Sequence, residues 1–483
     1  MEISLKKIIF VQDISNAKLM EFKKLIDRGA ELERMNEALH REDTQFIVIY
    51  GRRRIGKSEL IKRIVKARHK AIYFLSDTSS ETVQRVAFSK VAASVIDGFD
   101  KVIYPDWETL FRSFNNQLSE RMLVCLDEFP YLVKSCDVLP SIIQKLLNEK
   151  ILKFDLVLCG SSQQLMHGYV LNRQSPLYGL ANEIIKMQPI PAQYMSMAME
   201  CDAVQAVEEY AIWGGVPRYW ELRRDYPDKE TAIRKVLLDP QGPLIEEPQR
   251  LLRDDMRDTV QASTLLTIIG NGANKLSEIA NRAGKDSSTI SEPLSKLREL
   301  GYVSREVPFG ESPKKSKKGI YHINDSLLRF HYQFIVPYRS ILELGRMDMV
   351  MQVVLSQLPQ FIGQCWELLC REYVSGNIID GIAYNVASRW WGKIFPPEYK
   401  DVKMVELDVV AESIDKKHIL VGECKWTHDE DADRLMDVLE QKAKNLPFIK
   451  KGQEVHLVLF LKESPTHCVK GMRVFLPCDV MKI

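Results

Sequence analysis

The stretch FIVIYGRRRIGKS, residues 46–58, decides the fold. Residues 46–50 are apolar or aromatic and predict a buried strand, and the next eight match the pattern G-x-x-x-x-G-K-[ST]. Glycines allow backbone N–H groups to converge on phosphate oxygens, and the helical stretch that follows adds the positive end of its dipole. A glycine turn beside an unrelated lysine is the alternative, but it leaves the combination of strand, spacing and serine unexplained.

We therefore predict that this loop binds ATP and Mg²⁺. Lys57 is expected to hold the β- and γ-phosphates, and Ser58 is expected to bind the Mg²⁺ ion. The other nucleotide-binding residues are predicted to be Gly51, Arg52, Arg53, Arg54, Ile55 and Gly56.

A second apolar run, residues 123–126, ends in the carboxylates Asp127 and Glu128. An acidic strand end is commonplace alone, but beside a phosphate-binding loop it predicts a Walker B element. We expect Asp127 to bind Mg²⁺ through water and Glu128 to orient the attacking water.

Two further polar residues are candidates for the same site. Ser161 follows the apolar run 156–159 and is placed to sense the γ-phosphate, although a helix cap explains a serine there equally well. Arg218 follows the Gly-Gly-Val-Pro stretch 214–217, from which it is expected to reach phosphate; the alternative is a surface arginine beside a turn.

The 483 residues, 45% hydrophobic and 27% charged, exceed what one core serves and predict several globular domains. Five-residue apolar runs alternate with helical patterns up to residue 190, which predicts an α/β fold with a parallel sheet covered on both faces. The predicted domains are a P-loop ATPase core (1–190), a helical lid (191–255), a winged helix-turn-helix (256–335), a connecting helix (336–354) and a small α/β module (355–483).

Net charge, cysteine content and hydropathy indicate the kind of partner and the cellular compartment. The net charge of +2 provides no overall field for nucleic acid, so any basic site must be local. Nine cysteines without a CxxC pair fit buried thiols in a reducing compartment better than a zinc site. The opening residues 1–13 are too short an apolar run for a signal peptide, and no stretch reaches the ~18 apolar residues of a membrane span. We therefore predict a cytoplasmic protein with no membrane partner.

Residues 276–300 have the apolar spacing of two packed helices, and the second helix exposes Ser, Thr and Lys as a recognition helix does. A lysine-rich loop between Gly310 and Gly319 is expected to form a wing against DNA phosphates. Its lysines are Lys314, Lys315, Lys317 and Lys318. The alternatives are an adaptor between domains and a merely solvated loop.

Near the C-terminus, residues 405–410 and 418–426 predict a hairpin around 413–417. Strand alternation would set Asp408 opposite Glu423, and Glu406 opposite Lys425. Two opposed carboxylates repel unless a cation lies between them, which favours a divalent metal. The alternative is a solvated strand face whose Glu406–Lys425 ion pair contributes under ~1 kcal/mol.

These motifs resemble those of the prokaryotic, largely archaeal-type P-loop ATPases related to the AAA+ and STAND groups, and the resemblance covers nearly the whole chain. It rests on the segments 25–28, 31–32, 51–58, 126–129, 160–162, 175–179 and 214–219. The family often continues segment 175–179 with an arginine that would stabilise charge. Leu180 stands there instead, which argues against fast hydrolysis but not against ATP binding.

An acid followed by Glu-x-Lys on the neighbouring strand resembles the PD-(D/E)XK nuclease fold, and the family's C-terminal domain of unknown function is similar to it. The resemblance implies that Asp408 and Glu423 ligate Mg²⁺ and that Lys425 orients water or stabilises charge on the scissile phosphate. It also implies that Glu367 supplies the helical acid. The family stretch Arg-Trp-Trp-Gly, residues 389–392, is present, and we expect its two tryptophans only to pack.

The sequence thus predicts an ATPase whose nucleotide state controls a DNA-binding winged helix and a nuclease-like tail. A second hypothesis keeps the ATP switch and the DNA binding but makes the tail catalytically inactive. A small-substrate kinase is not favoured, because no motif beyond the phosphate site indicates a substrate pocket. Whether identical chains assemble into an oligomer stays open.

Overall fold

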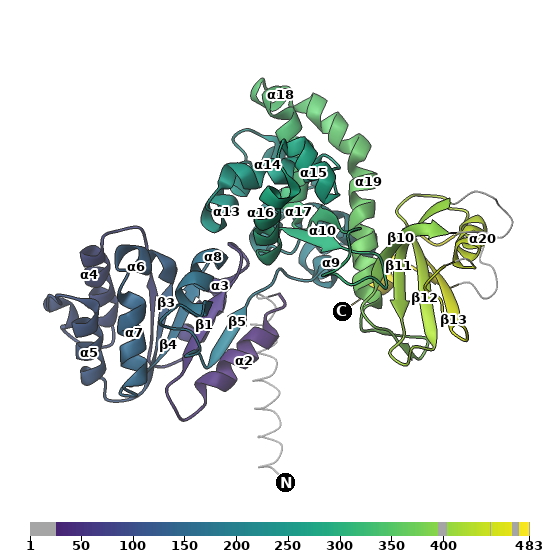
Figure 1. Ribbon diagram of the computed structural model, residues 1–483. Coiled ribbons are helices and arrows are strands. Elements are labelled where there is room, and N and C mark those ends of the chain that lie inside the picture. Colours follow the sequence, from purple (N-terminus) through teal and green to yellow (C-terminus); the bar gives the residue numbers. More distant parts are fainter. Residues whose placement is uncertain (1–25, 395–402, 445, 466–472, 483) are drawn as a thin grey trace, which may run out of the picture. The chain divides into compact units, whose positions relative to one another are not determined.

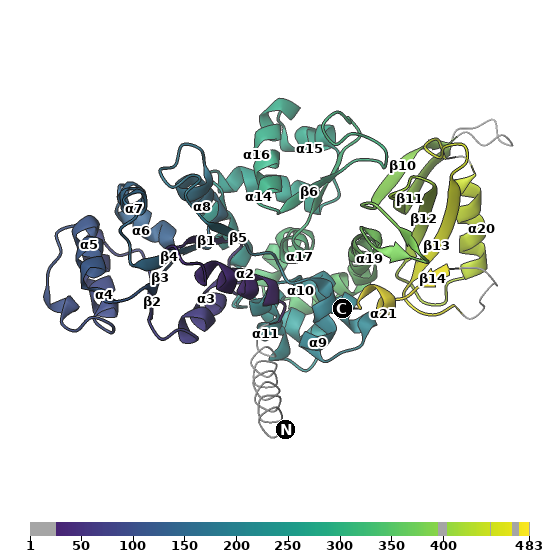
Figure 2. The same ribbon diagram turned by 90° about the horizontal axis from the view of Figure 1, so that it is seen from below.

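Residues 46–50 form the strand β1 (Phe46–Tyr50) of a five-stranded sheet with the order β2-β3-β4-β1-β5. The computed structural model (Figures 1 and 2) describes residues 26–394, 403–444, 446–465 and 473–482. Every strand pair in this sheet is parallel. The other strands are β2 (Ala71–Leu75), β3 (Met122–Asp127), β4 (Phe154–Gly160) and β5 (Glu183–Lys186). The predicted runs 46–50, 123–126 and 156–159 are confirmed as strands, and β5 is a short edge strand that the apolar runs did not reveal.

Helices cover both faces of this sheet, as its apolar strands require. The strands β3 and β4 are buried along their whole length. Helices α4 (Glu81–Ala92), α5 (Trp107–Gln117), α6 (Phe129–Ser135) and α7 (Leu139–Asn148) share a core with Phe46 and Val48, whereas α2 (Gly29–Leu39) and α3 (Lys57–Lys66) contact the strands on the other face. The predicted α/β class with a P-loop-type parallel sheet is confirmed.

Two compact units divide the chain. The first holds the sheet up to Ile190 together with Val216–Arg218 and Asp254–Met256. The second holds Pro191–Gly215, Tyr219–Arg253 and the chain from Arg257 onward. The helices after Ile190 are α9 (Met195–Met199), α10 (Ala203–Trp213), α11 (Pro217–Arg224), α12 (Lys229–Ala232) and α13 (Glu247–Asp255). Of these, α10 packs against α17 (Ser326–Phe330) and α19 (Met347–Val374) within the second unit.

The segment 256–335, predicted as a winged helix-turn-helix, contains three helices followed by a hairpin. Its helices are α14 (Thr259–Gly270), α15 (Leu276–Ala283) and α16 (Ser287–Glu299), and its hairpin pairs β6 (Val303–Glu306) with β7 (Ile320–Ile323). The turn at Gly284 has a φ of +62°, a left-handed conformation that favours glycine. Ile290, Leu294 and Leu297 are buried on α16, as their spacing predicts.

A second, mixed sheet follows, with the order β10-β11-β12-β13-β14. Its strands are β10 (Ser388–Ile394), β11 (Lys403–Glu412), β12 (His418–Lys425), β13 (Glu454–Leu461) and β14 (Arg473–Phe475). The predicted hairpin around 413–417 is confirmed, because β11 and β12 are antiparallel. The strands β12, β13 and β14 are parallel to one another. Helix α20 (Ala432–Ala443) contacts β12 and β13, and α19 contacts β11 and β12. Short elements complete this part: α18 (Arg339–Glu343), β8 (Ile378–Ile379), β9 (Ile382–Ala383) and α21 (Pro477–Val480).

The structure adds three details to the predicted domain boundaries, strands and cysteines. The 28-residue helix α19 runs unbroken through the predicted boundary at residue 355, so the connecting helix and the first helix of the module are one. The strand β10 was not predicted, and its Trp390 is buried in the core beneath α20. Among the described residues, six of the eight cysteines are buried, and no helix is long and apolar enough to cross a membrane. The opening residues 1–13 and Cys468, which also entered the predictions, lie outside the described residues.

Candidate functional site

The loop between β1 and α3 depends on its two glycines. Gly51 has a φ of +150°, and a Cβ atom there would lie 2.5 Å from the carbonyl oxygen of Met187. Gly56, the N-terminal cap of α3, has a φ of +95°. No other residue type fits both positions without strain, so the backbone itself fixes the shape of the loop.

Lys57 lies inside this loop. Its side chain is only 5% exposed, and its Nζ donates hydrogen bonds of 2.9 Å to the carbonyl oxygens of Gly51 and Arg52. An ammonium group that is held by two carbonyl oxygens keeps part of its hydrogen-bonding capacity for an anion. The structure therefore puts a buried cation where converging amides and a helix N-terminus favour phosphate.

Ser58 and Asp127 are in direct contact. The Ser58 hydroxyl donates a 2.6 Å hydrogen bond to Oδ2 of Asp127, so the two predicted Mg²⁺ ligands lie together between α3 and β3. Sequence reasoning missed Tyr73 of β2, whose hydroxyl donates to the same oxygen at 2.7 Å. Burial and the Asp127 carboxylate raise the pKa of Tyr73, so its hydroxyl stays a donor at neutral pH.

Glu128 and Ser161 form a second contact beside the first. Glu128 caps α6 with a φ of +54°, a conformation that costs a non-glycine residue of order 1 kcal/mol. Its Oε2 accepts hydrogen bonds from the Ser161 hydroxyl at 2.9 Å and from the Ser161 amide at 3.3 Å. The two predicted residues therefore meet, and the neighbouring Ser162, not Ser161, caps the helix α8 (Gln163–Met166).

The arginines around the loop differ in their surroundings. Arg52 is buried, and Arg53 forms a 3.5 Å ion pair with Asp254. Arg54 has a φ of +68°, and Arg218 is exposed in the first turn of α11. Sequence analysis assigned no role to Arg28, which is buried and donates to the carbonyl oxygens of Ile55 and Gln188 at 3.0 and 2.9 Å. Arg28 therefore holds the loop in place through these two carbonyl oxygens.

Leu180, which occupies the place of the family's arginine, is partly buried against the core of the parallel sheet. An apolar side chain there has a packing role and supplies no charge to the site.

A β-bulge positions Asp408 in the second unit. Ser388 pairs with Val410 and Trp390 with Leu407, so Asp408 and Val409 together oppose one residue of β10. The bulge directs the carboxylate inward, where it is 9% exposed and its Oδ2 accepts a 2.9 Å hydrogen bond from the Cys424 amide.

Glu367 of α19 faces the same carboxylate. Burial, and next the charge of Asp408, raise the pKa of Glu367 to about 7. Burial, and next the charge of Glu423, raise the pKa of Asp408. The paired register of β11 and β12 ends at Val409 and Gly422, and Asp408 and Glu423 are the next residues beyond that pair on the two strands. The charge of Glu423 acts on Asp408, as the prediction requires.

The lysines of this carboxylate cluster contact Glu423. Lys425 Nζ lies 3.0 Å from Oε1 of Glu423, and Lys442 Nζ of α20 lies 2.8 Å from Oε2. The expected opposition of Glu406 and Lys425 is wrong as an ion pair, because Glu406 is 64% exposed and bonds Arg389 at 2.8 Å. The bulge at Asp408 adds one residue to β11 between Glu406 and the hairpin turn. This extra residue reverses the face of the strand on which Glu406 lies, which explains why Glu406 does not pair with Lys425.

The hairpin β6–β7 also reaches this cluster. Arg371, one turn after Glu367, donates to the backbone oxygen of Asp408 at 3.0 Å and lies 3.4 Å from Glu306 of β6. Beyond β6, the Phe309 amide donates to the Arg389 carbonyl oxygen at 2.9 Å. The Phe309 ring packs edge-on against Phe448 at 5.1 Å. The spacing of Arg371 from Glu367 was a usable signal, whereas nothing local in the sequence marked Glu306.

The predicted DNA-facing side chains are accessible. Lys314, Lys315, Lys317 and Lys318 are exposed, and Lys318 pairs with Glu311 at 2.6 Å. On α16, Ser288, Thr289 and Ser291 are exposed.

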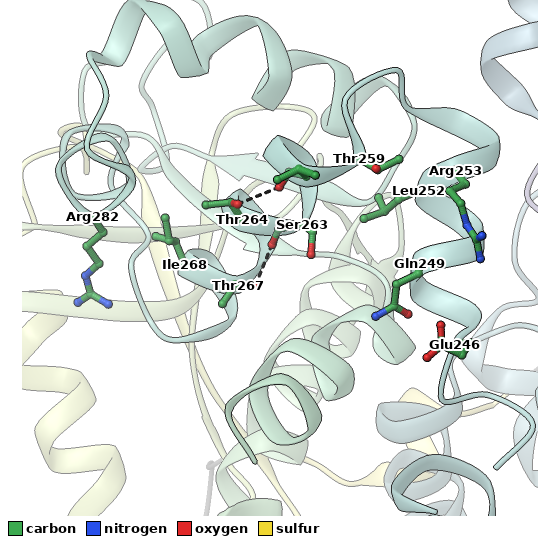
Figure 3. Close-up of a pocket in the computed structure, with 11 residues that line it drawn as sticks. Glu246, Gln249, Leu252, Arg253, Thr259, Ser263, Thr264, Thr267, Ile268 and Arg282 are labelled. Atoms are coloured by element: carbon green, nitrogen blue, oxygen red, sulfur yellow. Dashed lines mark hydrogen bonds between the residues drawn. The ribbon is translucent and has the colours of Figure 1, made fainter. Parts of the chain in front are cut away.

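A cavity of about 700 Å³ lies between α13, α14 and α15 (Figure 3). Its hydroxyl groups include those of Thr264 and Thr267, which bond carbonyl oxygens of their own helix. Arg253 and Arg282 lie at its two ends (Figure 3). It contains no predicted site residue, and we assign it no role.

Comparison with known proteins identifies the family. Residues 25–221 match an ATPase domain predominantly from Archaea, and residues 331–438 match archaeal and bacterial proteins of unknown function. An uncharacterized protein of Methanocaldococcus jannaschii, MJECL04, is 30% identical over 431 residues, which cover 87% of this chain and 92% of that protein. The chain belongs to the archaeal-type P-loop ATPases.

As a member of this family, the chain carries a nucleotide-binding ATPase domain, and the loop 51–58 lies within it. The Aeropyrum pernix ORC2 protein, solved as ADPNP–ADP complexes, aligns with 69% of this chain and 96% of its own length at 12% identity and a TM-score of 0.44. The Thermotoga maritima RuvB Holliday junction branch migration motor aligns with 60% of this chain and 89% of its own length at 16% identity and a TM-score of 0.30. At these scores neither likeness extends to the whole chain.

Proposed function

We propose that this archaeal-type ATPase is a Mg²⁺-dependent ATPase whose nucleotide state controls a DNA-binding winged helix and a nuclease-like C-terminal domain. The observation that carries the proposal is the pair of contacts Ser58–Asp127 and Ser161–Glu128, which lie beside the buried Lys57. They join four residues of the predicted ATP site near the carboxyl ends of three neighbouring parallel strands, β3, β4 and β1.

The donor set fits Mg²⁺. A hydroxyl and a carboxylate, 2.6 Å apart and both hard oxygen donors, are the protein ligands that Mg²⁺ takes beside nucleotide phosphates. Bound Mg²⁺ would neutralise charge on the β- and γ-phosphates. Lys57 exchanges its carbonyl partners for phosphate oxygens, and Tyr73 holds the Asp127 carboxylate in orientation.

Glu128 orients the water that attacks the γ-phosphate. Its strained backbone and its bonds to Ser161 fix the carboxylate before ATP binds. When the γ-phosphate takes the Ser161 hydroxyl as a partner, Glu128 is released toward water. Ser161 thereby couples nucleotide state to the catalytic carboxylate.

The helices α14–α16 with the hairpin β6–β7 have the order of a winged helix. The exposed hydroxyls of α16 suit a major groove, and the exposed lysines beyond β6 suit the phosphate backbone. Duplex DNA is therefore the proposed partner.

The carboxylate cluster fits a divalent cation. Burial, and next the charge of Asp408, raise the pKa of the partly buried Glu367, and burial, and next the charge of Glu423, raise the pKa of the buried Asp408. A cation among these carboxylates would relieve the repulsion. Asp408, Glu423 and Glu367 would hold Mg²⁺, which would polarise a phosphodiester oxygen. Lys425 orients water or neutralises the scissile phosphate. The contacts of Glu306 and Phe309 link the wing to the cluster and supply a path for control.

One observation favours the second candidate, an ATP-dependent DNA-binding switch with an inactive tail. Both carboxylate oxygens of Glu423 already bond lysines, Lys425 and Lys442. Two ammonium groups compete with a metal ion for this carboxylate, so catalysis requires that one of them withdraws.

Cleavage assays decide between the two candidates. Labelled linear and single-stranded DNA are incubated with Mg²⁺ or Mn²⁺, with and without ATP, for the wild type, Lys57→Ala and Asp408→Ala. Metal-dependent cutting that is lost in Asp408→Ala and altered in Lys57→Ala supports the first proposal. Absence of cutting by a wild type that binds ATP and duplex DNA supports the switch.

A further inference from the structure

A separate group of potential metal ligands lies at the opposite end of β12 from the carboxylate cluster. His418 is the first residue of β12, and Lys425 is the last. Glu423, the carboxylate that β12 supplies to the cluster, is five steps of about 3.3 Å, or roughly 16 Å, from His418, so the two sites cannot share an ion. Glu454 and His456 belong to the start of β13, which runs parallel to β12.

The strand register brings the three side chains to one face. Glu454 is the direct neighbour of His418 across the ladder, and His456 follows two residues later on the same strand. Residues two apart point to the same side of a strand, so all three project together. The backbone is fixed at this point, because the amide of His418 donates to Ser413 and that of Glu454 to the Lys417 carbonyl oxygen.

The distances match a metal-binding triad. Nδ1 of His418 lies 3.0 Å from Nε2 of His456 and 3.4 Å from Oε2 of Glu454, and Nε2 of His456 lies 3.9 Å from Oε1 of Glu454. Tetrahedral bonds of about 2.0–2.1 Å place ligand atoms roughly 3.3–3.4 Å apart, and small rotations of three side chains bring the observed spacings to that value. The three residues therefore need no backbone movement to surround one ion.

Carboxylates also lie near the triad. Burial, and next the charges of Asp380, Glu454 and Asp415, raise the pKa of Tyr384. The exposed pair His428–Glu463 offers a contrast, because Lys462 Nζ lies 3.0 Å from Nε2 of His428 and already supplies a cation. Imidazole nitrogens select transition metals over Mg²⁺ and Ca²⁺, which prefer oxygen ligands.

We propose that His418, Glu454 and His456 bind a divalent transition-metal ion of the Zn²⁺ class. Three protein ligands leave one tetrahedral position for water or an exogenous ligand. The ion joins β12 to β13 and steadies the turn 413–417. This site is independent of the proposed nuclease-like activity, because it shares no residue with that cluster.

Titration of the metal-free full-length protein with Co²⁺, in excess Mg²⁺, tests the proposal. Excess Mg²⁺ occupies oxygen-rich sites, and the visible absorption of Co²⁺ with nitrogen ligands reports the triad. We expect one Co²⁺ ion per chain, intense visible bands, and their displacement by Zn²⁺. His418→Gln and His456→Gln are expected to lose the bands, whereas His428→Gln and Asp408→Asn keep them.

A thermal melt with Zn²⁺ supplies a second readout. Zn²⁺ is expected to raise the Tm of the wild type and of His428→Gln but not of His456→Gln, with equal Tm values for all three proteins in EDTA. Bands that survive in both triad variants overturn the proposal, as does their loss in Asp408→Asn alone. Cys478→Ser distinguishes binding by the exposed thiol, and loss of the bands in that variant alone also overturns it.

Discussion

The nucleotide site and the carboxylate cluster are assembled in different ways. In the nucleotide site the phosphate loop follows β1, Asp127 ends β3, and Glu128 and Ser161 directly follow β3 and β4. Parallel strands bring their carboxyl ends to one edge of the sheet. In the cluster, the acids come from the helix α19, a bulge in β11, the end of β12 and the hairpin strand β6. A site built on strand ends is readable from local motifs, whereas a site built on a bulge and a helix face depends on tertiary packing.

The two sites also differ in how they hold charge. Lys57 donates hydrogen bonds to the carbonyl oxygens of Gly51 and Arg52, and Ser58 donates one to Asp127. Burial, and next the charge of Asp408, raise the pKa of Glu367, although Arg371 lies 3.8 Å from its carboxylate. The first site is therefore preorganised, whereas the second stores electrostatic strain that a cation relieves.

Glu128→Gln tests the preorganised site most strongly. We expect ATP turnover to fall by about 10²–10⁴-fold, because general-base catalysis contributes that much, while ATP affinity changes little. Single-turnover hydrolysis and nucleotide binding measure the two effects. Glu149→Gln, which alters an exposed carboxylate paired with Arg112, serves as the control. Undiminished turnover would remove Glu128 from the reaction.

Lys57→Ala tests the same site at the binding step. The loss of charge-assisted bonds to phosphate, each about 1.5–3 kcal/mol, is expected to weaken nucleotide binding by roughly 100-fold. Calorimetric titration of ATP measures the affinity, and Lys66→Ala at the exposed end of α3 is the matched control. Equal affinities for the two variants would contradict the proposed phosphate site.

Glu367→Gln tests the electrostatic strain in the cluster. The folded pKa of Glu367 is raised to about 7 from 4.5, so the unfolded chain releases this proton at lower pH than the folded chain does. The stability associated with this group is fully present below pH 4.5 and is lost as pH rises toward 7. At pH 8 in EDTA, the variant is expected to be more stable than the wild type by about 2 kcal/mol.

Thermal melts between pH 5 and pH 8 measure this difference, with the exposed Glu440→Gln of α20 as the control. Mg²⁺ is expected to raise the Tm of the wild type at pH 8 more than that of Glu367→Gln. Parallel pH profiles for the wild type and Glu367→Gln would show that the pKa of Glu367 is not raised in the folded chain.

The double substitution Lys314→Ala and Lys315→Ala gives the smallest expected effect. Each phosphate contact contributes about one unit to the salt dependence, so the slope for duplex DNA should fall by about two and the affinity severalfold. Titrations at several salt concentrations measure both quantities. Lys90→Ala with Lys101→Ala, two exposed lysines of the first unit, is the control, and an identical slope for both double variants would exclude the wing from DNA binding.

Local sequence determined the parallel sheet, its phosphate loop and the acidic strand end. Alternating burial and apolar runs are properties of single strands, and the glycines of the loop are required by local backbone angles. The hairpin around 413–417 was equally predictable, because its two strands adjoin in the chain. Such features depend on residues that are close in sequence, so a local sequence pattern is enough to predict them.

Tertiary structure decided the partners of the predicted residues. The bulge at Asp408 broke the expected opposition of Glu406 and Lys425, since one extra residue reverses the faces of a strand. Tyr73 reaches Asp127 from a neighbouring strand, and Glu306 reaches Arg371 from a distant hairpin. His418 and His456 meet only because β12 and β13 pair in parallel register. Long-range pairing determines these contacts, and no local pattern in one sequence encodes that register.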